Sequence, residues 1–89
     1  MEKDEAELKN VAALFYRLYN NGKWDNKGHT PIDNAVKGFP KHLRGDIKKL
    51  IEKLVKRGFL LKAKHNYGEG ISLRMDKLKE IEDIIEKYH

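Results

Sequence analysis

Apolar residues recur every three or four positions across residues 4–19, which is the spacing of one side of an α-helix. Asp4 stands three residues before Glu7, an arrangement that caps helix N termini, and Asn20-Asn21-Gly22 supplies a left-handed stop. We therefore predict a helix over residues 4–19. Its buried stripe is expected to contain Leu8, Val11, Ala12, Phe15, Leu18 and Tyr19.

A turn-rich segment and a short helix are predicted next. In "GKWDNKGH" (residues 22–29), Trp24 is the one large apolar group, and we expect it to cover the core because it has so much area to bury. Thr30 then supplies a hydroxyl N-cap, and Pro31 suits the first helical position, where no amide is needed. This helix would end at Gly38. Its inward residues are expected to be Ile32, Ala35 and Val36.

The strongest amphipathic pattern lies in residues 41–57. Leu43, Ile47, Leu50 and Leu54 fall on one side of a helical projection, and Ile51 and Val55 widen this stripe. Gly58 follows as a good stop residue. The opposite side is mostly cationic. It carries Lys41, Gly45, Lys48, Lys49, Glu52 and Lys56.

Beyond this helix the period changes to two. The runs "FLLKAK" and "ISLR" alternate apolar and polar residues, and "HNYGEG" lies between them, with Gly68 and Gly70 available for positive φ. We predict a β-hairpin with a long tip, which places Lys62 and Lys64 on the same side. A last helix is predicted over residues 75–88. Its apolar face contains Leu78, Ile81, Ile84, Ile85 and Tyr88.

Composition narrows the class of protein. A chain of 89 residues is too short for two ordinary domains, so we expect one domain over residues 1–89. The absence of cysteine excludes a disulfide framework and a thiolate metal site. No apolar run approaches the roughly 18 residues of a membrane span, and the start is not leader-like, so we expect a cytoplasmic protein. Lys and Glu dominate and Gln is absent, a bias seen in thermophile proteins.

The positive charge belongs to one segment. Residues 37–74 contain eleven Lys or Arg and three Asp or Glu, whereas residues 1–36 and 75–89 are each slightly acidic. Such asymmetry is typical of a surface that binds a polyanion. The cationic side of residues 41–57 has no Asn or Gln, and Arg44 lies at its edge, so contact with phosphates is favoured over base readout.

The order helix, short helix, turn, basic helix, hairpin, helix resembles the winged helix-turn-helix superfamily. The most specific stretch is "TPIDNAVKGFPKHLRGDIKKLIEKLVKRGFLLKAKHNYGEGISL", and within it "LVKRGFLLK" is similar to the passage from recognition helix to wing. The resemblance covers nearly the whole chain. It implies an α+β fold with a three-helix core, a β-hairpin wing and a C-terminal helix.

The resemblance also implies a function. Members of the superfamily usually place the third helix in the major groove of DNA and the wing on the backbone or in the minor groove. The resemblance therefore implies a protein that binds double-stranded DNA, such as a small transcriptional regulator. Carried onto this chain, the nucleic-acid-binding residues would be Lys41, His42, Arg44, Lys48, Lys49, Lys62, Lys64, His65 and Tyr67.

Other functional classes are weighed against this one. An enzyme is not expected, because Ser72 and Thr30 are the only hydroxyl nucleophiles besides tyrosines. The four histidines lie in four different elements, so neither a metal nor another cofactor is expected. One alternative is a protein-interaction module, with a homodimer formed through Ile81, Ile84, Ile85 and Tyr88 of the last helix. Another is an RNA-binding module that uses Tyr67 and the wing cations.

Overall fold

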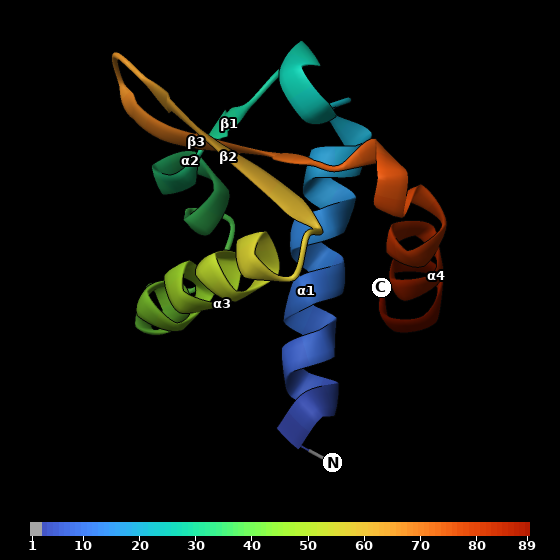
Figure 1. The fold of residues 1–89 in the computed structure, drawn as a ribbon. Helices are drawn as coiled ribbons and strands as arrows, with labels where there is room; N and C mark the ends of the chain where they lie inside the picture. Colours follow the sequence, from blue (N-terminus) through green and yellow to red (C-terminus); the bar gives the residue numbers. More distant parts are fainter. Residues whose placement is uncertain (1–2) are drawn as a thin grey trace.

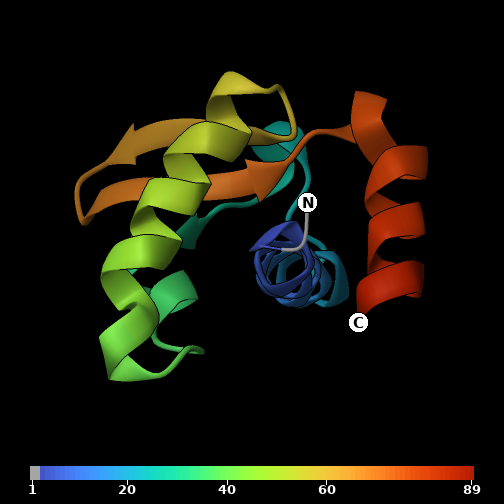
Figure 2. The ribbon, with the colours of Figure 1, turned by 90° about the horizontal axis from the view of Figure 1, so that it is seen from below.

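The computed structural model describes the backbone of residues 3–89 and the side chains of residues 5–89. Within this range it has four α-helices and a three-stranded antiparallel sheet, so the α+β class predicted from the sequence is confirmed. The helix α1 (Lys3–Asn20) lies between α3 (Arg44–Lys56) and α4 (Leu78–Tyr88), as the end-on view in Figure 2 shows. The predicted cap at Asp4 falls outside the described side chains.

The core forms around α1, which is covered on two sides. Val11, Ala12, Phe15 and Leu18 are buried as predicted. Leu14 is also completely buried, although it lies outside the predicted stripe, because it stands one turn after Asn10 on the side of α1 that faces α3. The two ends of the stripe differ from the prediction. Leu8 is half-buried, and Tyr19 is exposed, with its hydroxyl donating to Glu82 Oε2 at 2.6 Å.

The predicted N-cap at Thr30 is wrong, because Thr30 belongs to a strand. Thr30 and Pro31 form β1 (Thr30–Pro31), which pairs antiparallel with β3, Thr30 opposite Ile71 and Pro31 opposite Gly70. The short helix α2 (Ile32–Val36) begins only after Pro31 and has no side-chain cap. Ala35 and Val36 are buried and Ile32 is half-buried, so the inward side of this helix is as predicted.

The hairpin is tighter at its tip than the sequence suggested. β2 (Leu60–His65) pairs with β3 (Gly68–Leu73) up to His65 opposite Gly68, which leaves only Asn66 and Tyr67 in the turn. Gly68 has a φ of 120°, as a turn glycine requires. Gly70 does not have a positive φ; it lies in the middle of β3 between Ala63 and Pro31. The sheet order is β1-β3-β2 (Figure 1).

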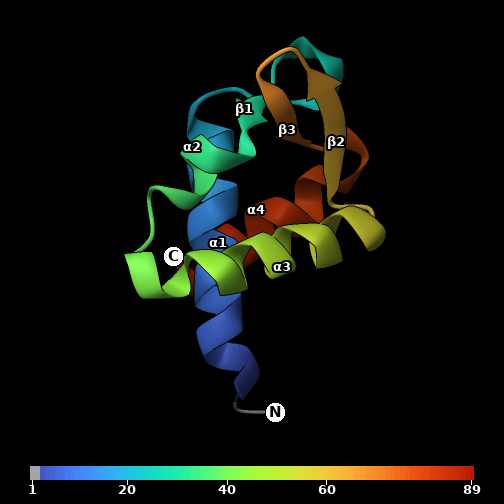
Figure 3. The same cartoon turned by 90° about the vertical axis from the view of Figure 1, so that its left-hand side faces the viewer.

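The basic helix begins with a turn of 3-10 helix at Lys41–Leu43 and continues as α3. Its buried residues are Ile47, Leu50, Ile51 and Leu54. Gly58 follows with a φ of 85°, which confirms the predicted stop. In Figure 3, α3 crosses in front of α1 with the hairpin above it, so one long side of α3 faces solvent.

Two other expectations concern the periphery. Trp24 packs against the core and meets Tyr19 edge-on, so its predicted role as a cover is confirmed. Ile81 of α4 is fully buried, Ile84 and Ile85 are partly buried against the core, and Tyr88 is half-buried. None of the helices in residues 3–89 has both the length and the apolar composition needed to cross a membrane.

Candidate nucleic-acid interface

The solvent side of α3 carries a ridge of lysines. Ile47, Leu50, Ile51 and Leu54 fix the helix against the core, so the residues between them point outward. Lys48 lies 3.7 Å from Asp33, a loose and exposed ion pair of the kind that contributes little to stability. Within the described part of the chain, Lys41, Lys49 and Lys56 have no ion pair. These four residues, Lys41, Lys48, Lys49 and Lys56, are called the α3 ridge below.

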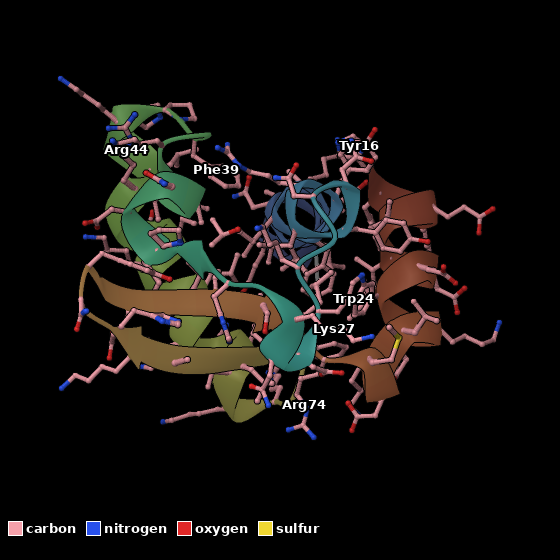
Figure 4. All side chains as sticks on the ribbon, turned by 90° about the horizontal axis from the view of Figure 1, so that it is seen from above. Tyr16, Trp24, Lys27, Phe39, Arg44 and Arg74 are labelled. Atoms are coloured by element: carbon pink, nitrogen blue, oxygen red, sulfur yellow. The ribbon has the colours of Figure 1, made fainter. Side chains whose placement is uncertain are left out.

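Arg44 is directed back toward the protein. Its Nε donates to the carbonyl of Phe39 at 3.2 Å, and its Nη2 lies 3.5 Å from the carbonyl of Lys37. Figure 4 shows Arg44 beside Phe39 at the turn between α2 and α3. Arg44 therefore helps to hold this turn, and its guanidinium is partly committed there. Lys41 and His42 are exposed in the 3-10 turn just before α3.

Lys62 connects the hairpin to α3. Its ammonium donates to both carboxylate oxygens of Glu52 at 2.9 Å and lies 3.9 Å from Glu69. Hydrogen bonding to Glu52 raises the pKa of Lys62 above its ordinary value of 10.5; partial desolvation opposes this, and the charges of Glu52 and Glu69 add to it. The positive charge of Lys62 is thus neutralised by carboxylates of the protein itself. Lys64, which stands opposite Glu69 in the sheet, is exposed and has no ion pair in the described residues.

Three rings stack at the tip of the hairpin. His65 and Tyr67 are nearly parallel with centroids 4.8 Å apart, and His29 lies 5.0 Å from His65. They rest above Gly70, where an added Cβ would stand 2.8 Å from the Tyr67 hydroxyl and 3.0 Å from His29 Cβ. Burial lowers the pKa of His29 below its ordinary value of 6.5, and the charges of His65 and Lys23 lower it further. His29 Nε2 is buried without a hydrogen-bond partner in the described structure.

A groove of about 360 Å³ runs between α3 and the hairpin tip. It brings together three of the nine residues predicted from the sequence: Lys48, Lys49 and Tyr67. It also contains three carboxylates, and its wall includes the start of α2 and the edge of β3. The remaining lining residues are Pro31, Ile32, Asp33, Glu52, Gly68 and Glu69.

The sequence reasoning missed the three carboxylates of this groove, Asp33, Glu52 and Glu69. They come from α2, α3 and β3, and no spacing rule joins residues so far apart along the chain. For Glu52 and Glu69 the one local signal was their position inside the most basic segment, and Asp33 lies outside that segment. The other predicted residues, Lys41, His42, Arg44, Lys62, Lys64 and His65, do not line the groove.

Charges of opposite sign lie on opposite sides of α1. Glu80, Glu82, Asp83 and Glu86 are exposed on α4, whereas the α3 ridge lies beyond the other side of α1 (Figure 2). The molecule is therefore electrostatically polar, and a polyanion that approaches the α3 side avoids the acids of α4. The homodimer through α4 stays a prediction.

Ser72, one of the two hydroxyl side chains considered as nucleophiles, lies inside the fold. The hydroxyl of Ser72 is fully buried and donates to the Asp25 carbonyl at 2.7 Å. In residues 5–89, no cluster of three or more His, Asp or Glu side chains is placed to hold a metal ion. Comparisons with protein-family models, with curated proteins and with solved structures gave no significant match.

Proposed function

We propose that this protein is a winged-helix protein that binds double-stranded DNA, with α3 in the major groove and the β2–β3 hairpin as the wing on the backbone. The layout is compatible with such a fold: α1, α2 and α3 contribute buried residues to one core cluster, β1 adds a third strand to the hairpin, and α4 follows. A helix with one free long side suits the width of the major groove, which admits an α-helix.

The observation that carries the proposal is the α3 ridge. Three of its four lysines have no ion pair in the described residues, and the fourth has only a loose one. Unpaired lysines side by side on a rigid helix repel each other, and phosphates relieve that repulsion while releasing condensed counterions. A face that served only for solubility would be expected to interleave acids with its lysines, as α4 does.

The side chains of the ridge favour phosphate contact over the recognition of particular bases. Lysine is a point charge, while bidentate readout of guanine or adenine is best made by Arg, Asn or Gln. Of the two arginines at the ends of the ridge, Arg44 is hydrogen-bonded to the α2–α3 turn and Arg57 caps the far end of α3. We therefore expect affinity that depends strongly on salt and only weakly on DNA sequence.

The test is a pair of charge reversals of equal size. Lys48→Glu/Lys49→Glu removes the centre of the α3 ridge, and Lys79→Glu/Lys87→Glu makes the same change in net charge on α4. Fluorescence anisotropy with a blunt duplex at low salt should show about a hundredfold loss for the first variant, because each phosphate contact adds to counterion release. The second should stay within about threefold of the wild type. Equal losses would mean that only net charge matters, and no loss in either would refute DNA binding by α3.

RNA is distinguished in the same assay. A structured RNA that competes with the duplex at equal or lower concentration would favour the RNA alternative. We expect the duplex DNA to bind more tightly, because A-form helices present a major groove too narrow for α3. Circular dichroism of each variant verifies that the fold is retained.

A further inference from the structure

The groove between α3 and the hairpin tip is ill suited to phosphate alone. A surface that only held the DNA backbone would gain from cations at every position, yet three of the nine residues that line this groove are carboxylates. Asp33, Glu52 and Glu69 each face a lysine, but the contacts of Asp33 and Glu69 are long, at 3.7 and 3.9 Å. A carboxylate has about four acceptor positions. Most of those on Asp33 and Glu69 remain free for another donor.

An aromatic platform stands at the same groove. Tyr67 is 56% exposed although the ring of His65 covers one of its faces at 4.8 Å. Its position is built into the fold: His29 supports His65 from behind, and Gly70 leaves room for the Tyr67 hydroxyl where any larger residue would displace it. An exposed ring that is held on one face and open elsewhere is the usual receptor for a stacked nucleobase.

The backbone adds further polar groups. β1 ends at Pro31, opposite Gly70, so the edge of β3 at Gly68 and Glu69 has no strand beside it on that side. Both residues line the groove. Its volume of about 360 Å³ falls within the range of about 300–1,000 Å³ found for small-molecule sites, which is ample for one base.

We propose that this groove holds an unpaired nucleobase of a DNA strand whose neighbouring duplex lies on the α3 ridge. The base stacks on Tyr67, its exocyclic amino group donates to Glu69 or Asp33, and the ammonium groups of Lys48 and Lys49 meet the flanking phosphates. The inference rests on the proposed function, and it narrows the substrate to DNA with a single-stranded extension beside a duplex. Cytosine and guanine suit the carboxylates better than thymine, because thymine has no amino group.

The test compares a blunt duplex with the same duplex extended by a short overhang of cytosines on either strand. Wild-type protein should bind one of the extended duplexes about tenfold more tightly than the blunt one, near the low end of what stacking on an aromatic side chain contributes. Tyr67→Ala should weaken binding of the extended duplex about tenfold more than binding of the blunt one, and so remove this difference. Tyr67→Phe should keep it, because the ring is retained.

The chain supplies a matched control for Tyr67. Tyr16 is 39% exposed and also stacks on a histidine, with its ring 4.2 Å from that of His89, but it lies beside α4 and away from the hairpin (Figure 4). Tyr16→Ala should preserve the tenfold preference. A second variant, Glu69→Gln, should reduce the preference for a cytosine overhang over a thymine overhang, because the amide is a weaker acceptor than the carboxylate.

The outcomes separate this inference from the proposed function. Equal affinity of the wild type for blunt and extended duplexes overturns the base site and leaves duplex binding standing. Binding of single strands without binding of the blunt duplex supports the base site and refutes α3 as a duplex reader. An equal loss on both DNAs in Tyr67→Ala shows that Tyr67 only supports the fold, and no binding of any DNA overturns both proposals.

Discussion

α3 and α4 are two amphipathic helices that flank the same central helix, yet their outer faces differ. On α4, acids are interleaved with lysines, and two of the acids have a polar partner: Glu80 lies 3.7 Å from Lys77, and Glu82 accepts a hydrogen bond from Tyr19. On α3, Lys48 forms a loose ion pair with Asp33 of α2, and Lys53 forms an ion pair with Glu7 of α1. The other three lysines of the ridge have no ion pair in the described residues. The apolar stripe thus decides where a helix packs, and the outer face decides what it is used for.

The two helices also differ in how deeply they are buried. α3 buries four residues, whereas α4 buries only Ile81 completely and leaves Ile84 and Ile85 partly exposed. A binding surface needs a rigid base, because side chains that move with their helix lose entropy on binding. The deeper burial of α3 therefore supports its assignment as the binding helix.

The largest effect we predict tests this difference in burial. Ile51→Ala on α3 should lower the free energy of unfolding by about 3 kcal/mol, because the side chain is fully buried and its removal leaves a cavity. Ile85→Ala on α4 should cost about 1 kcal/mol, since Ile85 is only partly buried. Urea denaturation measures both. Losses of equal size would show that α4 is as much part of the core as α3.

The same comparison indicates what the sequence could predict. The stripe of α3 was found because its buried residues fall on one side of the helix, which matches a single helical period, although Leu43 at its start is only half-buried. α1 was only partly predicted, since α3 and α4 cover two of its sides and Leu14 lies on the side that faces α3, beyond the predicted stripe. Thr30 was misread because Thr-Pro before an apolar run is equally typical of a cap, and only pairing with the distant Ile71 makes it a strand.

The candidate site was less predictable than the fold. Lys48, Lys49 and Tyr67 were identified from charge and from their place in the predicted helix and hairpin, and the structure gathers them around one groove. The three carboxylates and the support of Tyr67 by His29 depend on contacts between elements distant in sequence. Lys62 was predicted as a free cation because its partner Glu52 stands ten residues earlier on another element.

A medium effect is predicted for two glycines of opposite environment. Gly45 lies on the outer side of α3 with nothing within 4 Å of an added Cβ, so Gly45→Ala should stabilise the protein by about 1 kcal/mol through helix propensity. Gly70→Ala should destabilise it by about 1 kcal/mol, because the new methyl group meets His29 Cβ and displaces Tyr67. Thermal unfolding measures both signs. A stabilising Gly70→Ala would contradict the close seat of the three rings.

The smallest effect concerns pH and again contrasts the wing with α3. The folded state lowers the pKa of His29 below 6.5, so His29 contributes stability above pH 6.5 that is lost as the pH falls through its folded pKa. The charged groups that act on it are His65 and Lys23, both of which oppose its protonation, and the Tyr67 hydroxyl lies near its Cβ above Gly70. Protonation of His29 at low pH should therefore weaken the stack of His29, His65 and Tyr67.

His29→Gln should flatten the fall in stability between pH 7 and pH 5, because glutamine stays neutral over that range. The matched control is His42→Gln, since His42 is exposed in the turn before α3. That variant should keep the wild-type profile. Urea midpoints across this range measure the three proteins. An unchanged slope in His29→Gln would mean that protonated His29 finds a partner in the folded protein, and the ring stack would then be no weaker in acid than at neutral pH.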